Sequence, residues 1–300
     1  MKTAYLILAH RQPALLANLV RALTCDWATF FIHVDLKSDI IPFRRLLDPL
    51  DGIRFLAAER RVKVSWGGFS QVRATLNLLE TALAYDGSFS RFCLLSGADF
   101  PIKPLAVIRE RLASDQEFMR VDRCLSGAGV EREGRTRAVS RYHFLDWPLP
   151  RWLKLRLLSG KLPRRPYPGL ALYHGAQWWA LTGGCVRHII EYVATHPGYA
   201  DFHRHTLAPD EIFFHSLVKD SPFSARLSHD FERASSPREF AATNDHGCHY
   251  IDWNAPQQAL PKVLTLEDLP ALQRSPALFA RKFDESRSQE LLQALGRVVG

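Results

Sequence analysis

The chain has 300 residues, 47% of them hydrophobic, and a formal net charge of +8 at pH 7. This length and composition can bury a large core, as one big α/β domain or two small ones. No apolar stretch approaches the length of a bilayer span, so we expect no membrane-spanning segment. The positive charge favours anionic partners, namely nucleotide phosphates, acidic polymers, nucleic acid or an anionic membrane surface, without choosing among them.

The cysteines indicate a compartment. Five of them are scattered along the chain, and no CxxC pair occurs. An odd, dispersed set argues for reduced thiols rather than a disulfide framework. The short apolar run at residues 5–9 ends in His10 and Arg11, which predicts a first strand and not a signal peptide. We therefore expect a cytoplasmic protein.

Strand-like and helix-like segments alternate through the first half of the chain. Apolar runs predict strands at residues 4–9, 30–35, 53–56 and 92–96, whereas helical spacing of apolar residues predicts helices at 13–23, 41–47, 70–85 and 105–113. Alternation of this kind is typical of βαβ units. We predict an α/β fold with a Rossmann-like, mostly parallel central sheet flanked by helices.

The character of the chain changes in its middle. Arginine, glycine and proline dominate residues 126–168, and residues 151–165 hold six Lys or Arg among Trp152 and several leucines. That tract could rest on an anionic membrane or form a disordered acceptor loop. Regular patterning returns at residues 175–192, 211–218 and 284–298. No linker divides the chain cleanly, so we predict one domain over residues 1–300.

Two carboxylates lie at predicted strand ends. Asp99 follows the apolar run 92–96, and Asp35 closes the second predicted strand, residues 30–35. Ligands of open α/β sheets collect beyond the carboxyl ends of such strands, which predicts a nucleotide or nucleotide-sugar site there. Asp35 could fix a base or ribose hydroxyl, or simply cap its strand. Many sugar-nucleotide enzymes hold a metal with two aspartates one residue apart here, but this chain has only Asp99.

Aromatic residues suggest binding surfaces. Trp66 precedes two glycines and could stack under a base, or pack in the core above a tight turn. Trp178 and Trp179 follow Gln177, and a Trp pair beside an amide suits the apolar faces and hydroxyls of sugars. On a strand the two rings point to opposite sides. We therefore expect one to be structural and the other to reach the substrate.

Charged residues in the second half suggest catalysis. Asp210 and Glu211 follow Pro209 at a predicted helix start, where acids commonly serve as caps. Apolar packing after Glu211 would raise the pKa of its carboxyl and make it a usable general base. Lys262 and Lys282, isolated among apolar residues, could bind a diphosphate or be solvated surface residues.

Taken in order, eight segments resemble one family: AYLILAHRQP, IHVDLKS, VSWGGFSQVRATLNLLE, LLSGADFPIKP, GAQWWALT, APDEIFFHSL, YIDW and LFARKFD. The family is that of the core-2/I-branching β-1,6-N-acetylglucosaminyltransferases, glycosyltransferase family 14, which includes the peptide-O-xylosyltransferases. The resemblance runs from about residue 3 to 284. The WGG and IDW segments resemble the xylosyltransferase-like and bacterial branch.

The resemblance implies a GT-A-like fold and inverting, metal-independent transfer from a UDP-sugar to an acceptor hydroxyl, forming a β-linkage without a cofactor. It places the catalytic base on Glu211 and phosphate contacts on Lys282 and Lys262. Donor contacts fall on Leu8, His10, Asp35 and Lys63, to which we add Trp66 and Asp99, the latter as a structural or sugar-hydroxyl contact. We assign the acceptor to Gln177, Trp178, Trp179 and Asp210.

The resemblance also divides the domain and suggests partners. We expect a nucleotide-binding half at about 1–125, an acceptor-binding half at 126–256 and a phosphate-contacting tail at 257–300. A bacterial cytosolic enzyme of this kind would move GlcNAc or xylose to a glycan or lipid-linked saccharide, with peripheral contact to the inner membrane face and no nucleic acid. The alternatives are a metal-dependent sugar-nucleotide enzyme and a non-catalytic carbohydrate-binding protein.

Overall fold

The computed structural model describes residues 1–126, 134–148, 150, 152–153, 160–233, 244–254 and 260–299. Much of the basic tract at 151–165 lies outside these described residues, and with it the membrane or acceptor contact predicted there. No helix in the described ranges is both long and apolar enough to cross a bilayer.

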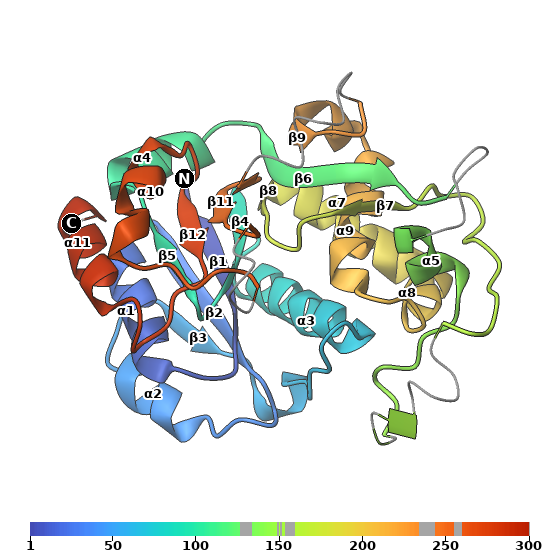
Figure 1. Cartoon of the computed structure of the whole chain (residues 1–300), viewed down its shortest axis with the longest axis horizontal. Helices are drawn as coiled ribbons and strands as arrows, with labels where there is room; N and C mark the ends of the chain where they lie inside the picture. The colour runs from blue at the N-terminus through green and yellow to red at the C-terminus, as the bar shows by residue number, and fades with distance from the viewer. Residues whose placement is uncertain are drawn as a thin grey trace.

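A parallel group of strands forms one half of the main sheet (Figure 1). Its order is β3-β2-β1-β4, and the strands are β1 (Thr3–Ala9), β2 (Ala28–Val34), β3 (Ile53–Phe55) and β4 (Arg91–Ser96). The crossovers are α1 (Pro13–Leu23), α2 (Ile41–Leu47) and α3 (Phe69–Tyr85). Pro13 begins α1 where a missing N–H costs nothing, and leucines at helical spacing then face the core. These elements confirm the predicted βαβ alternation.

The other half of the sheet is largely antiparallel. It continues from β4 through β8 (Ala180–Thr182), β6 (Glu117–Cys124) and β7 (Tyr173–Gly175), with β9 (Leu227–Asp230) parallel to β6. Among the strands described, four pairings of this sheet are parallel and three are antiparallel. The mixed α/β architecture with a mostly parallel central sheet is therefore confirmed.

A second sheet connects the C-terminal part of the chain to the end of β4. Its order is β10-β11-β12-β5, formed by β10 (Asp245–His246), β11 (His249–Ile251), β12 (Phe279–Arg281) and β5 (Asp99–Pro101). The antiparallel register of β12 and β5 pairs Arg281 with Asp99. A cation close to the C-terminus is thereby brought to the strand end that the sequence indicated as a ligand site.

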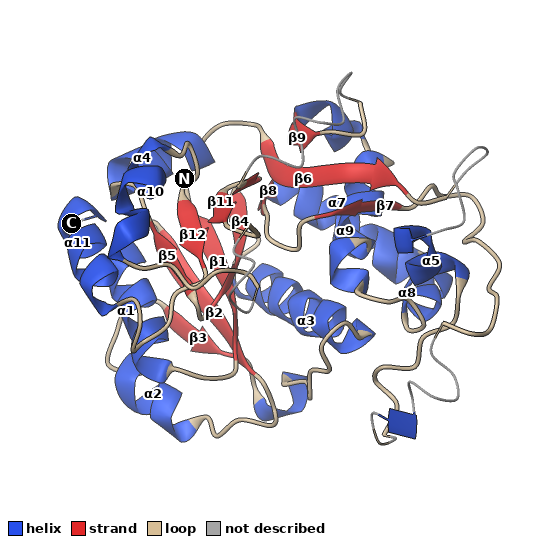
Figure 2. Ribbon diagram, in the orientation of Figure 1, coloured by secondary structure: helices blue, strands red, loops and turns tan. Residues whose placement is uncertain are grey.

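Helices cover both faces of the sheet (Figure 2). One hydrophobic cluster packs α1, α2, α4, α10 and α11 on one face, and the other packs α3, α7, α8 and α9 on the opposite face. The remaining helices are α4 (Leu105–Leu112), α5 (Arg137–Ser140), α7 (Gly183–Thr195), α8 (Pro197–His203), α9 (Phe213–Lys219), α10 (Leu269–Arg274) and α11 (Gln289–Val299). Short 3-10 turns are η1 (Ala58–Arg60), η2 (Gly134–Thr136), η3 (Pro209–Glu211), η4 (Pro222–Arg226) and η5 (Leu266–Asp268).

Two predicted helix starts in the second half of the chain differ from the structure. Glu211 does not begin a helix; it ends η3, and α9 starts at Phe213. The last helix begins at Gln289 rather than at 284, because the Asp284 carboxylate accepts the backbone N–H of Ser286 in a turn before it. Strands β6 and β12 lacked a clear alternating pattern and were not predicted. The division at about residues 125 and 256 stays a prediction.

Candidate active site

A cavity of about 660 Å³ opens at the carboxyl ends of the parallel strands. Its walls come from the ends of β1, β2 and β4, the loop before α3, the segment from β7 to β8, and η3. The structure brings eight predicted site residues to this cavity: Leu8, His10, Asp35, Trp66, Gln177, Trp178, Asp210 and Glu211. Five others, Lys63, Asp99, Trp179, Lys262 and Lys282, are not among its lining residues.

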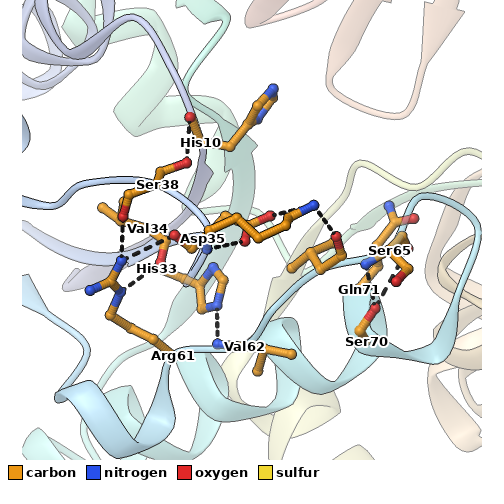
Figure 3. A network of polar contacts seen from close by, with 12 residues as sticks. His10, His33, Val34, Asp35, Ser38, Arg61, Val62, Ser65, Ser70 and Gln71 are labelled. Carbon is orange, nitrogen blue, oxygen red and sulfur yellow. Dashed lines mark hydrogen bonds and ion pairs between the residues drawn. The ribbon is translucent and has the colours of Figure 1, made fainter. Parts of the chain in front are cut away.

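The loop that follows β2 is braced by polar contacts (Figure 3). The Arg61 guanidinium donates to the carbonyls of Val34, Asp35 and Ser38 at 2.8–3.0 Å. The Ser38 hydroxyl donates to the His10 carbonyl at 2.7 Å and so links the ends of β1 and β2. Arg61 thus holds the backbone while the Asp35 side chain lines the cavity.

Asp35 and His33 lie at the same strand end. Oδ1 of Asp35 accepts the Lys37 backbone N–H at 2.9 Å, and the Lys37 ammonium lies 3.5 Å from Oδ2. Nε2 of His33 accepts the Val62 N–H at 2.9 Å (Figure 3), and burial lowers the pKa of His33 to about 4. His33 is therefore a neutral structural group, and Asp35 is the side chain available to a ribose or base. Lys63 is exposed beside this region but outside the cavity.

Arg281 lines the cavity and was not predicted. Its guanidinium carbon lies 4.2 Å from the centre of the Trp178 ring, and Nε lies 3.8 Å from Oδ1 of Asp99. Burial lowers the pKa of Arg281, against the opposing effect of Asp99. Nε and Nη1 have no hydrogen-bond partner among the described residues. A buried, still charged guanidinium with free donors is suited to binding an anion.

Lys282 follows Arg281 and adds a second positive charge. Burial, Arg11 and Arg281 lower the pKa of Lys282, and its charge also contributes to the lowered pKa of His10, of which burial is the main cause. Lys282 therefore lies near the His10 edge of the cavity. The charges of Arg11, Arg281 and Lys282 give this edge a positive potential.

Lys262, predicted as the second phosphate contact, lies beside Lys282 along the backbone, since its carbonyl accepts the Lys282 N–H at 3.3 Å. Its ammonium donates to Oδ1 of Asp268 at 2.6 Å, and that aspartate forms a capping box with Thr265 at the start of η5. In this structure the ammonium is therefore paired with Asp268, and the role of Lys262 as a phosphate contact stays a prediction. Arg281, which directly precedes Lys282, is a further cation at the cavity. Arg281 and Lys282 are adjacent in the FARKF segment, and this adjacency is the sequence feature that could have indicated Arg281.

Asp99 is also structural. Its carboxylate is fully buried and accepts the Ser96 N–H at 2.7 Å, the Ser96 hydroxyl at 2.5 Å and Nε2 of His249 at 3.2 Å. Burial alone would raise the pKa of Asp99, but the Arg281 charge and these hydrogen bonds outweigh it and lower the pKa. Asp99 is thus an ionised anchor for Arg281. Of the two roles predicted for it, the structural one is observed.

The tryptophan pair divides as expected. Trp178 lines the cavity, whereas Trp179 is fully buried and packs 5.4 Å from Phe214, ring centre to ring centre. The assignment of Trp179 to the acceptor is therefore wrong, because its ring has no exposed surface and packs against Phe214 in the core. Trp66, in contrast, is not a core residue, because 83% of it is exposed at the cavity edge. Trp253 also lines the cavity and is about half exposed.

Glu211 meets a group of polar side chains at the far end of the cavity. Nε2 of His174 lies 3.0 Å from Oε2 of Glu211, and Nδ1 of His174 lies 3.2 Å from Oδ2 of Asp122. Nε of Arg120 donates to Oδ1 of Asp122 at 2.6 Å. Nη1 of Arg135 contacts His174 and lies 4.0 Å from Oε2 of Glu211. The sequence did not predict these partners of Glu211. The one feature that could have indicated them is that His174 directly precedes the GAQWW segment.

Asp210 has the apolar setting that was predicted for Glu211. Its carboxyl is buried, and Oδ2 accepts Nε2 of Gln71 at 3.2 Å while Oδ1 has no partner among the described residues. Burial, helped by the Glu211 charge, raises the pKa of Asp210 to about 7. The Glu211 side chain, in contrast, is 37% exposed, so its carboxylate reaches the cavity solvent.

The backbone positions η3 against the Trp66 loop. The Ala208 N–H donates to the Gly67 carbonyl at 2.8 Å, and both residues have positive φ, +48° and +72° respectively. Gln71 reinforces this connection, since its amide accepts the Gly67 N–H at 2.6 Å and donates to Asp210. The exposed Trp66 and the carboxylates of η3 are therefore parts of one braced wall.

The geometry defines an α/β protein with a polar cavity at the carboxyl ends of its parallel strands, and comparison with known proteins gives the family. The family model described as "Branch: Core-2/I-Branching enzyme" matches residues 3–273. The chain therefore belongs to the core-2/I-branching enzyme family, which is a family of glycosyltransferases. The predicted family resemblance is confirmed.

Curated relatives are xylosyltransferases. Xylosyltransferase 2 of Mus musculus is 26% identical over 98% of this chain, xylosyltransferase of Ciona intestinalis 25% over 98%, and xylosyltransferase oxt of Drosophila melanogaster 26% over 93%. The chain spans about a third of the length of these relatives, 31–34%. Among solved structures, apo mouse xyloside xylosyltransferase 1 matches with a TM-score of 0.33 and 12% identity, covering 76% of this chain and 84% of that one.

Proposed function

We propose that the protein is an inverting glycosyltransferase that moves a sugar from a UDP-sugar to an acceptor hydroxyl. The observation that supports this most is the joint lining of one cavity by a carboxylate, Glu211, and a buried cation, Arg281. A general base and a diphosphate contact are the two groups that direct displacement at an anomeric carbon requires. Family membership agrees with this reaction.

In the proposed step, Glu211 accepts the proton of the acceptor hydroxyl while the acceptor oxygen bonds to the anomeric carbon. The bond from that carbon to the UDP oxygen breaks on the opposite face, so an α-linked donor gives a β-linked product. Every contact made by the Glu211 carboxylate among the described residues goes to Oε2, which leaves Oε1 available for the proton. General-base help of this kind typically contributes about 10²–10⁴-fold.

Arg281 and Lys282 would stabilise the departing diphosphate. Both are cations at the strand end where a nucleotide would lie, and Arg281 keeps unused donors. With Asp35 available to the nucleoside and these two charges available to the phosphates, we propose that transfer proceeds without a divalent metal. Activity in the presence and absence of EDTA tests this point.

Trp178 and Gln177 line the cavity near Glu211's wall and would contact sugar, with Asp210 beside the base. We propose GlcNAc or xylose as the donor sugar, because the curated relatives are named xylosyltransferases and the family is named for branching enzymes. A glycan or lipid-linked saccharide is the proposed acceptor, met in the cytoplasm with peripheral contact to an anionic membrane.

The decisive experiment compares wild type with Glu211→Gln. We expect turnover, measured as UDP release from UDP-xylose or UDP-GlcNAc, to fall by about 10²–10⁴-fold. UDP affinity, measured by calorimetry with and without EDTA, should stay within about twofold, because the proposed phosphate contacts are Arg281 and Lys282 and not Glu211. Glu59→Gln on the exposed turn η1 is the matched control. Full turnover by Glu211→Gln would refute the assignment.

A further inference from the structure

Glu211 is held by side chains for which the proposed mechanism has no role. His174 on β7 bridges two carboxylates, Oε2 of Glu211 at 3.0 Å and Oδ2 of Asp122 at 3.2 Å. Its side chain is only 8% exposed, so water cannot easily replace either contact. Carboxylate contacts on opposite ring nitrogens orient an imidazole and favour a proton on each nitrogen, although Nη1 of Arg135 also lies against Nε2.

Local strand geometry aims these groups at one another. The register of β6 and β7 shifts between Val121 and Arg123, so Asp122 falls at a bulge. A bulge redirects the side chain of the inserted residue, here toward His174. Nε of Arg120 then holds Oδ1 of Asp122 at 2.6 Å. Arg120, Asp122 and His174 thus form a continuous series of contacts from β6 to Glu211.

Close approach of β7 to β6 depends on a glycine. A Cβ on Gly175 would lie 1.8 Å from the Arg120 carbonyl oxygen and 2.6 Å from Cδ2 of His215. No side chain fits there, and the neighbouring His174 is thereby kept within reach of Asp122. The backbone is therefore adapted to the bridge.

Charges around His174 favour its protonated form. Burial alone would lower the pKa of His174, but hydrogen bonds to Asp122 and Glu211 and the Glu211 charge outweigh burial and raise it. Arg135, whose side chain is 58% exposed, opposes them. The other charged or titratable groups that face this cluster are Arg120, Asp210, His215 and His246; burial lowers the pKa of His215 to about 4 and that of His246 to about 3, which keeps both neutral.

We propose that His174 and Asp122 are positioning residues for the general base. The imidazolium donates Nδ1–H to Asp122 and Nε2–H to Oε2 of Glu211, which directs Oε1 toward the acceptor hydroxyl. This inference rests on the proposed function of Glu211 as the base. His174 itself exchanges no proton with the substrate: the acceptor proton goes to Glu211, and the imidazolium stabilises the carboxylate before the transfer.

A pH dependence follows from this arrangement. Once His174 loses its proton, Oε2 of Glu211 loses a charged donor, so kcat should fall on the alkaline side. Asp122 stabilises the imidazolium, so Asp122→Asn should move that alkaline limb to lower pH. His174→Gln, which supplies a neutral amide donor, should lower kcat by roughly 10–100-fold and remove the limb, a smaller loss than the 10²–10⁴-fold typical of a general base.

The first test needs no substrate. We would follow the imidazole Cε1–H signal of His174 by NMR titration of the full chain, assigned by its loss in His174→Gln. Its midpoint should lie above that of free histidine and fall by about one pH unit or more in Asp122→Asn and in Glu211→Gln. His196→Gln, an exposed histidine after α7, is the control and should leave the midpoint unchanged.

Kinetics complete the test. UDP release is measured across pH for His174→Gln, Asp122→Asn and Glu211→Gln, and UDP calorimetry reports whether each variant is folded; His174→Asn replaces His174→Gln should that variant unfold. An unchanged His174 midpoint, or wild-type kcat and alkaline limb in the His174 variant, overturns the inference while leaving Glu211 as the base. Wild-type turnover in Glu211→Gln overturns the proposed function instead, and the NMR midpoints still decide whether the bridge exists.

Discussion

The guanidinium of Arg281 stacks over the indole of Trp178, with 4.2 Å between its central carbon and the ring centre. Asp99, fully buried, lies 3.8 Å from Nε on the other side. An aromatic face and a carboxylate together hold the cation while leaving two of its nitrogens without hydrogen bonds. Arg281 is in this way held with free donors facing the cavity, as the proposed diphosphate contact requires.

The two adjacent cations should govern nucleotide affinity. We expect Arg281→Ala and Lys282→Ala each to weaken UDP binding by roughly 10-fold or more, since hydrogen bonds to charged groups contribute about 1.5–3 kcal/mol. Lys262→Ala is the matched control, because its ammonium is occupied by Asp268 at 2.6 Å. Calorimetry with UDP checks all three variants. Equal loss of affinity in Lys262→Ala would contradict the placement of the phosphate site.

The neighbouring tryptophans should separate binding from stability. Trp179 is fully buried against Phe214, so Trp179→Ala should lower the free energy of unfolding by about 3–5 kcal/mol. Trp178→Ala should reduce turnover and UDP-sugar affinity more than stability, because Trp178 lines the cavity and supports Arg281. Urea unfolding and UDP release measure the two effects. The opposite pattern would show that the two rings have been assigned to the wrong sides.

Asp210 should make stability depend on pH. Its folded pKa of about 7 lies above the unfolded value, so the folded state binds the extra proton and stability falls as pH rises from about 4 to 7. Asp210→Asn removes this penalty and keeps the hydrogen bond from Gln71. We expect the variant to gain about 1–4 kcal/mol over wild type at pH 8, and less at pH 5.

Urea unfolding at the two pH values provides the measurement for Asp210. Asp201→Asn on α8 is the control, because its side chain is 65% exposed and pairs only with Arg204 across one turn. A stability difference that is the same at pH 5 and pH 8 would mean that Asp210 does not titrate in this range.

Gly175 should be intolerant of any side chain. Gly175→Ala places Cβ 1.8 Å from a backbone carbonyl, so β7 must move away from β6. We expect the free energy of unfolding to fall by at least about 1–3 kcal/mol. Turnover should also fall, because His174 is displaced. Gly296→Ala in α11 meets nothing within 4 Å and should stabilise the helix by about 0.5–1 kcal/mol. Thermal unfolding of both variants measures these effects. Wild-type stability and turnover in Gly175→Ala would show that the site does not depend on the close approach of β7 to β6.

Much of the first part of the chain, up to β4, was predictable from the sequence. Apolar runs and helical spacing are properties of neighbouring residues, and they placed β1, α1, α2 and α3 within a residue or two. The end of β2 at Asp35 and the segment before Glu211 were found because polar residues interrupt apolar runs locally. Family resemblance added the order of the motifs and the expectation of a base and two cations.

The tertiary structure decided which side chains meet. Residues 122, 174 and 211 lie far apart along the chain, and only the bulge in β6 and the pairing of β7 bring them together. The pairing of β12 with β5 likewise brings Arg281 beside Asp99. Sequence pattern determines the period and burial of each element, because these depend on adjacent residues. Contacts across the cavity depend on the register between distant strands, which no local pattern encodes.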